Sequence, residues 1–125
     1  MKILESAENY LETILVLKNK NGSVRSIDVA NELGFTKPSV SVAMKQLREN
    51  GYITVDEDGS LNLTETGKNV AERVFERHNI IAKALMALGV DEETAYSDSC
   101  KIEHYISAQS VAKIKEYLQK VESEK

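Results

Sequence analysis

The sequence contains one cysteine, one proline and no tryptophan. A single cysteine, Cys100, excludes a disulfide within the chain. No apolar stretch approaches the roughly 20 residues that a membrane-spanning helix needs, and the short apolar start ends at Glu5, before a signal-peptide core could form. We therefore expect a cytoplasmic protein that does not enter a membrane and that is held together by an apolar core.

Charge of one sign is not dominant either. The chain has 125 residues, 42% of them hydrophobic and 29% charged, with a formal net charge of −4. This length suits one compact domain or two small domains that share a core. A negative net charge argues against a protein that coats nucleic acids indiscriminately, but it permits a local basic surface.

The first predicted helix starts at Ser6, as its cap, and ends at Asn21. Apolar residues recur in it at three- and four-residue spacing. Glu8 and Glu12 stand one turn apart, with Asn9 beside them. Two such carboxylates usually mark a solvated surface, and the alternative is that they bind a cation.

A helix-turn-helix pattern follows. Ser26 is expected to cap a short helix over 27–33, which ends at Gly34. A second helix starts at Thr36, with Pro38 in its first turn, where a missing N–H group costs nothing. A short helix, a tight glycine turn and a longer helix are typical of DNA-binding modules.

The outward residues of the second helix favour DNA binding. From Thr36 to Arg48 the sequence has three basic residues and no acidic one. Small hydroxyl side chains can approach base edges, whereas lysines meet phosphates; the alternative is a solvated helix with a chance run of lysines. The predicted DNA-binding residues are Ser26, Thr36, Lys37, Pro38, Ser39, Ser41, Val42 and Lys45.

Two short alternating segments, 52–55 and 60–63, flank the turn signal Asp58-Gly59 and predict a β-hairpin. A hairpin after a helix-turn-helix makes a winged helix. Its tip, 56–58, is acidic and would repel phosphates, so we expect the wing to pack more than to grip DNA.

The remaining sequence predicts three more helices. A long one runs from Thr64 to about Gly89, and its apolar stripe includes His78, either as a satisfied core residue or as an inward ligand. Asp91 and Ser107 are expected to cap the next two. The narrow seam of the last helix is best buried in a homodimer. The predicted fold is mainly α, with a winged helix-turn-helix domain over 1–70 and a helical dimerisation domain over 71–125.

The stretch Cys100-Lys101-Ile102-Glu103-His104 is the candidate centre of the molecule. On a helix, Cys100, Glu103 and His104 would project from one face, offering a thiolate, a carboxylate and an imidazole over roughly 6 Å of axis. This donor set suits a transition metal of intermediate softness. Taken alone, the same residues also fit a solvated face with a small buried cysteine.

The motifs together resemble the diphtheria toxin repressor and manganese transport regulator family. The resemblance rests on carboxylates in the first helix, Leu63-Thr64-Glu65-Thr66-Gly67 after the wing, Glu76-Arg77-His78, and the stretch from Cys100 to His104. It covers nearly the whole chain, in the order and approximate spacing of the family. It implies a metal-activated transcriptional repressor. Some larger members carry a third, SH3-like domain, and this chain ends without one, so we expect the short two-domain form.

The resemblance also implies a ligand set. It makes Glu103 and His104 ligands, matches His78 to a histidine of both branches of the family, and gives Cys100 a position that is Cys in the iron branch and Glu in the manganese branch. Glu12 matches a carboxylate of the manganese branch. Asn9 falls where the family has Met or Asp, and Glu8 is the alternative there. We expect Fe²⁺, with Mn²⁺ close behind, and Zn²⁺, Co²⁺ or Ni²⁺ as surrogates.

The resulting hypothesis is a homodimer that binds a palindromic operator when a cation ties the first helix to the helix of Cys100. One rival is a winged-helix regulator that responds to oxidation of Cys100, or to a small molecule, instead of metal. A second rival is an enzyme with Cys100 as nucleophile and His104 as base. The sequence shows no plausible oxyanion donors near them, so we do not expect an enzyme.

Overall fold

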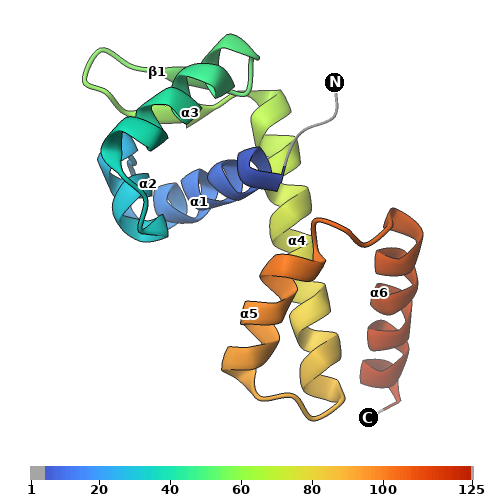
Figure 1. Cartoon of the computed structure of the whole chain (residues 1–125). Coiled ribbons are helices and arrows are strands. Elements are labelled where there is room, and N and C mark those ends of the chain that lie inside the picture. The colour runs from blue at the N-terminus through green and yellow to red at the C-terminus, as the bar shows by residue number, and fades with distance from the viewer. Residues whose placement is uncertain (1–4, 125) are drawn as a thin grey trace. The chain divides into compact units, whose positions relative to one another are not determined.

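The computed structural model describes residues 5–124, and for Glu5 only the backbone (Figure 1). The chain divides into two compact units, one up to Arg73 and one from Val74 onward. The first unit contains α1 (Glu5–Asn21), α2 (Ser26–Leu33) and α3 (Lys37–Glu49), followed by a hairpin of β1 (Ile53–Val55) and β2 (Leu61–Leu63). Helix α4 (Glu65–Ala87) starts in this unit and continues into the next.

The core of the first unit is built from the inner faces of its three helices and its hairpin. Complete burial of one such aliphatic side chain contributes about 1.5–3 kcal/mol. The inner stripe of α3 consists of three buried residues spaced three and four apart. The core residues include Leu11, Ile14 and Leu17 of α1, Val29 of α2, Val40, Met44 and Leu47 of α3, and Ile53 and Leu61 of the hairpin.

The helix-turn-helix is closed by local backbone chemistry. Gly34 has a φ of 71°, the left-handed conformation that glycine adopts without strain. Thr36 caps α3 by accepting the backbone N–H of Ser39 at 3.3 Å. The predicted cap of α2 is wrong: the cap is Arg25, and its backbone N–H donates to Asp28 at 2.9 Å, which places Ser26 inside the helix. Ser6 likewise lies inside α1 and does not cap it.

The wing pairs Ile53 with Leu63 and Val55 with Leu61 in an antiparallel register. Ile53 is buried but Val55 is 39% exposed, so the predicted alternation fails at Val55, the end of a three-residue strand. At the tip, Asp58 accepts the backbone N–H of Ser60 at 3.0 Å, and this bond holds the pKa of Asp58 below its ordinary value.

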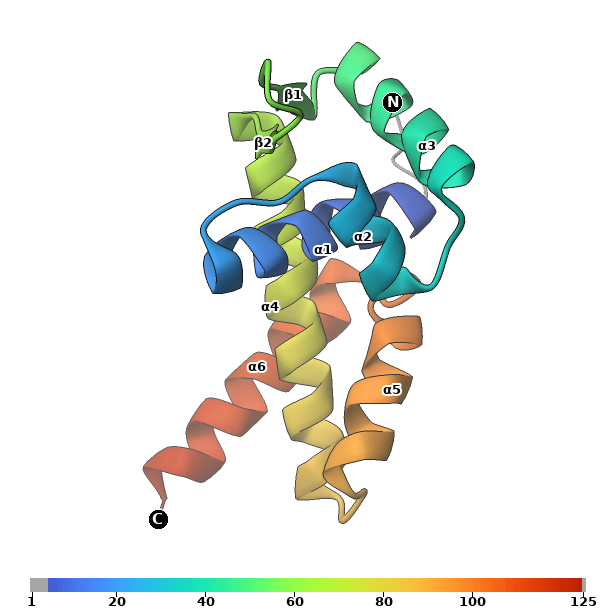
Figure 2. The same ribbon diagram turned by 90° about the vertical axis from the view of Figure 1, so that its left-hand side faces the viewer.

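The wing is also fastened to its neighbours in the first unit. The backbone N–H of Leu61 donates to the carbonyl of Val24 at 2.8 Å, which ties β2 to the segment before α2. On the other side, the Thr64 hydroxyl donates to the carbonyl of Gly51 at 2.7 Å. Figure 2 shows the hairpin beside the start of α4.

The second unit contains the rest of α4, then α5 (Glu92–Ile102) and α6 (Ala108–Ser123). Helix α5 runs back alongside α4 (Figures 1 and 2). The predicted caps are confirmed, because Asp91 accepts the backbone N–H of Thr94 and Ser107 that of Ser110, both at 3.1 Å. Leu88 continues the apolar spacing of α4 in the sequence but is 82% exposed, because it follows the last residue of the helix.

The mainly α fold with a winged helix-turn-helix is therefore confirmed. The second unit leaves several large apolar side chains at least partly exposed. These side chains are Phe75, Leu88, Ile102, Tyr105 and Tyr117. Among the described residues, no helix is long and apolar enough to cross a membrane.

Candidate metal centre and nucleic-acid interface

Four of the predicted metal ligands lie together in the second unit. Nε2 of His78, on α4, lies 3.3 Å from Sγ of Cys100, near the end of α5. Nδ1 of His78 lies 3.7 Å from Oε2 of Glu103, and Nε2 of His104 lies 3.5 Å from Oε1 of the same carboxylate. Cys100 is exposed, and the His104 side chain is 1% exposed.

The local backbone differs from the one predicted. Helix α5 ends at Ile102, Glu103 is its C-terminal cap, and His104 lies in the following turn, so His104 does not share a helical face with Cys100 and Glu103 as predicted. Glu103 keeps helical torsion angles, φ −58° and ψ −25°, and its N–H still donates to the carbonyl of Ser99 at 3.0 Å. The turn after the helix brings the His104 imidazole to the carboxylate.

Burial makes the Glu103 carboxylate the strongest indication of a cation. The residue is 2% exposed, and its side chain is fully buried. A buried carboxylate is costly unless positive charge or hydrogen-bond donors compensate it. His78 and His104 approach this carboxylate from two sides, and a cation bound beside it would also compensate its charge.

The donor atoms also lie near the spacing of a metal site. Two ligands that each lie about 2.1 Å from one ion are about 3 to 3.5 Å apart. Through Nδ1, His78 lies 3.7 Å from Oε2 of Glu103 and 3.8 Å from Sγ of Cys100, somewhat beyond this range, while its Nε2 lies 3.2 Å from the carbonyl of Tyr96. Thiolate, imidazole and carboxylate together suit a divalent first-row transition metal. The donor types of the second unit therefore suit a metal ion of this class, and His78 pairs with both Cys100 and Glu103.

Arg77 supports the centre and was not predicted from the sequence. Its Nη1 atom donates to the backbone carbonyls of Glu103 and Ile106, each at 3.3 Å. It thereby holds the turn between α5 and α6, which carries His104. Only its position beside His78 in the sequence could have pointed to it.

The candidate ligands of α1 lie in the first unit. Glu12 is 9% exposed. Glu8 is engaged in an ion pair, since its Oε2 accepts from Nη2 of Arg73 at 3.0 Å. Asn9 lies between them on the helix and is partly exposed. Glu8 would have to exchange its arginine for a metal.

The predicted DNA-binding residues lie mostly on the outer face of α3. Lys37, Pro38, Ser39, Ser41, Val42 and Lys45 are exposed, and Val42 is 58% exposed. Thr36 serves the helix itself, because its hydroxyl donates to Oγ of Ser39 at 2.9 Å in addition to capping. Ser26 is partly buried at the start of α2. The solvent-facing side of α3 thus offers lysines, hydroxyls and one aliphatic side chain.

A winged helix joined to a helical unit with a buried donor cluster defines a metal-dependent, DNA-binding regulator. Comparison with known proteins identifies the family. Residues 2–61 match the N-terminal DNA-binding domain of iron-dependent repressors, and residues 64–124 match their metal-binding and dimerisation domain. The chain therefore belongs to the iron-dependent repressor family, which includes the diphtheria toxin repressor and manganese transport regulator proteins.

Individual relatives agree. The chain is 32% identical to the HTH-type transcriptional regulator MntR of Lysinibacillus sphaericus, over 94% of this chain and 84% of that protein. It is 33% identical to the protein of the same name from Bacillus subtilis, over 95% and 84%. The structure of the manganese regulator SloR has the same fold, with a TM-score of 0.80 at 23% identity. The match covers 90% of this chain and 53% of the SloR chain.

The chain is thus a metal-dependent DNA-binding transcriptional repressor and not an enzyme. The second domain is a dimerisation domain in this family. The predictions of a metal-activated repressor and of a homodimer on operator DNA agree with this membership.

Proposed function

We propose that the protein represses genes of metal homeostasis when Fe²⁺ or Mn²⁺ is bound, by holding a palindromic operator as a homodimer in the cytoplasm. The observation that carries this proposal is the buried Glu103 carboxylate between the imidazoles of His78 and His104. A divalent cation bound at this buried carboxylate would compensate its charge.

The proposed ligands in the second unit are His78, Cys100, Glu103 and His104. When bound, the ion supplies charge compensation and a fixed geometry among them. Glu12 is proposed as a further carboxylate ligand, with Asn9 beside it, and this part rests on the family resemblance. Glu8 is the less favourable candidate, because Arg73 already holds its carboxylate.

The choice of metal depends on two opposing features. A thiolate is a softer ligand than a carboxylate and favours Fe²⁺ over Mn²⁺. The relatives reported above include a manganese regulator, which favours Mn²⁺. Zn²⁺, Co²⁺ and Ni²⁺ suit the same donors and are expected as surrogates in vitro.

The proposed division of labour follows the two units. Residues 1–70 bind DNA, with α3 as the recognition helix and Lys37, Pro38, Ser39, Ser41, Val42 and Lys45 facing the duplex, and with Ser26 and Thr36 at its edge. Residues 71–125 bind metal and dimerise, covering the exposed apolar side chains of the second unit. An ion that also took Glu12 would restrict one unit relative to the other. Two recognition helices could then meet successive major grooves, about 34 Å apart.

The experiment compares metal-free and metal-loaded protein on one duplex. The duplex is selected from a random pool with anaerobic protein and Mn²⁺ or Fe²⁺, and its affinity is measured with each metal, with Zn²⁺ and with chelator. We expect tight, sequence-specific binding only with metal, and a palindromic selected sequence. The His104→Ala protein should behave like the chelated wild type.

Retention of the selected duplex by chelated protein would contradict the proposal. It would favour a regulator that responds to oxidation of Cys100, whose exposed thiol next to His78 is accessible to oxidants. Treatment of chelated wild-type and Cys100→Ser protein with peroxide separates the two, because only the wild type would then change its affinity for the duplex.

A further inference from the structure

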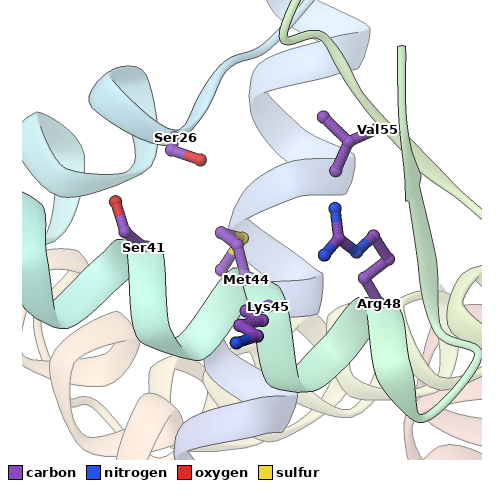
Figure 3. Close-up of a pocket in the computed structure, with 6 residues that line it drawn as sticks. All are labelled: Ser26, Ser41, Met44, Lys45, Arg48 and Val55. Atoms are coloured by element: carbon purple, nitrogen blue, oxygen red, sulfur yellow. The ribbon is translucent and has the colours of Figure 1, made fainter.

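A pocket of about 210 Å³ opens between α2, α3 and β1 in the first unit (Figure 3). Figure 3 shows the side chains of Ser26 and Ser41 at one end of it, Arg48 and Val55 at the other, and Met44 between them. A water molecule takes about 30 Å³ of liquid, so the pocket has room for a small anionic group and a few waters. The lining residues are Ser26, Ser41, Met44, Lys45, Arg48 and Val55.

The polar groups of this pocket suit an anionic ligand. Two serines, a lysine and an arginine line it, and among the described residues no acidic residue does. Among the residues that the structure describes, neither Lys45 nor Arg48 takes part in an ion pair. Guanidinium and hydroxyl groups bind phosphate oxygens well, and an arginine can present two parallel N–H donors.

A role for Arg48 in stabilising the helix alone does not explain where its guanidinium group lies. The residue stands in the last turn of α3, where a cation interacts favourably with the partial negative charge of the helix end. That role requires no particular direction of the side chain. In Figure 3 the guanidinium lies on the side of α3 that faces Val55, within the pocket shared with β1.

We infer that this pocket receives one phosphodiester of the DNA backbone, with Arg48 as its principal ligand and the hydroxyls of Ser26 and Ser41 as further donors. The inference rests on the proposed function and adds a phosphate contact at the wing end of the recognition helix. Met44 and Val55 supply an apolar wall that suits the deoxyribose next to such a phosphate. The contact also places positive charge beside a wing whose tip, 56–58, is acidic.

The test measures binding of metal-loaded, full-length protein to the selected duplex and to a scrambled duplex at several salt concentrations. Arg48→Gln removes the charge, and Lys113→Gln removes one charge from α6 as the matched control. We expect Arg48→Gln to weaken both duplexes by the same factor, roughly tenfold, and to lower the slope of log affinity against log salt by about 1. The control should leave both quantities unchanged.

A second measurement identifies the phosphate. Each backbone phosphate of the selected duplex is replaced, one at a time, by a neutral methylphosphonate. We expect one position per half-site at which the replacement weakens binding of the wild type but does not weaken binding of Arg48→Gln any further. At the same position, the replacement should weaken binding of Ser41→Ala less than binding of the wild type.

Three outcomes would overturn the inference. The first is that no position behaves in this way, and the second is that Arg48→Gln changes the preference for the selected duplex over the scrambled one, which would make Arg48 a reader of bases. The third is a wild type that shows no metal-dependent preference for the selected duplex. That result removes the proposed function together with the inference, whereas the first two leave the proposed function intact.

Discussion

Sγ of Cys100 lies 3.3 Å from Nε2 of His78, so the only sulfur of a cysteine in the chain stands against an imidazole of another helix. Sequence spacing alone does not establish this pairing, since 22 residues separate the two. The thiol and the imidazole are the softer donors of the centre, while Glu103 is the hard one. Substitution of the thiol or of the carboxylate should therefore change the affinities for soft and for hard metals to different extents.

Replacement of Cys100 by Ser should change the metal preference more than the ability to bind metal. The hydroxyl keeps the position of the sulfur but is a much poorer ligand for Zn²⁺ and Co²⁺. We expect the ratio of Zn²⁺ to Mn²⁺ affinity to fall at least about tenfold. Competition with a chelator of known affinity measures this ratio.

Cobalt provides the control for that substitution. Because Cys100 is the one cysteine, a thiolate-to-cobalt charge-transfer absorption in the wild type can come from no other residue. The absorption should be missing in Cys100→Ser. An unchanged Zn²⁺ to Mn²⁺ ratio, or a cobalt spectrum without thiolate character in the wild type, would show that Cys100 is no ligand.

Replacement of Glu103 by Gln should remove metal binding without unfolding the protein. The amide has the same size but no charge, so the variant keeps the packing of the side chain and loses its attraction for a cation. Metal at one hundred times its Kd should stabilise the wild type by about 2.7 kcal/mol and the variant hardly at all. Thermal unfolding with and without Mn²⁺ measures both. Equal stabilisation of the two proteins would mean that the ion binds elsewhere.

Much of the fold could be predicted because its signals are local. Gly34 ends α2 in a left-handed conformation, and Thr36, Asp91 and Ser107 cap the helices that follow them, all within three or four residues. The cap of α2 was predicted wrongly because a serine is the usual cap residue. Here the carboxylate of Asp28 binds the N–H of Arg25, one position earlier.

The sequence predicts the residues of the candidate metal centre but not their geometry. Periodicity treats 100–104 as helix, and only the structure shows that α5 ends at Ile102 and that His104 turns toward the carboxylate. The pocket of Arg48 and the contacts of Arg77 join residues of different elements, and no spacing rule reaches them. Leu88 kept the period of α4 but lies beyond its last residue, where the period has no meaning.

Replacement of Gly67 by Ala should destabilise the first unit. A Cβ atom at this position would collide with the backbone carbonyl oxygen of Tyr52, which cannot rotate away as a side chain would. Overpacking of this kind costs about 1–3 kcal/mol. Urea unfolding measures the loss, with Lys68→Ala at an exposed neighbouring position as the control. A variant as stable as the wild type would mean that the wing can shift away from α4 at no cost.

The cap of α5 should contribute stability that depends on pH. The backbone N–H and then the hydroxyl of Thr94 hold the pKa of Asp91 below its ordinary value of 3.8. Because the pKa is lower in the folded chain, the contribution is complete above the unfolded pKa and is lost as the pH falls through the folded one. Asn also caps helices, so Asp91→Asn removes the charge alone. The difference in unfolding free energy between wild type and variant should be constant near neutrality and should shrink below about pH 4. A difference that stays constant down to pH 2 would contradict this assignment.

Replacement of Arg77 by Met should weaken metal binding although the residue is not proposed to touch the ion. The methionine fills similar space but loses both hydrogen bonds to the carbonyls of Glu103 and Ile106, so the turn that presents His104 gains freedom. Loss of such a supporting contact typically lowers metal affinity 10- to 100-fold. Lys83→Met removes one exposed charge from the same helix and is the matched control. A purely structural role would lower the melting temperature of the metal-free protein and leave the Mn²⁺ affinity of the folded protein unchanged. The expected result is the reverse, a small change in the metal-free melting temperature and a large loss in affinity, measured by calorimetric titration with Mn²⁺.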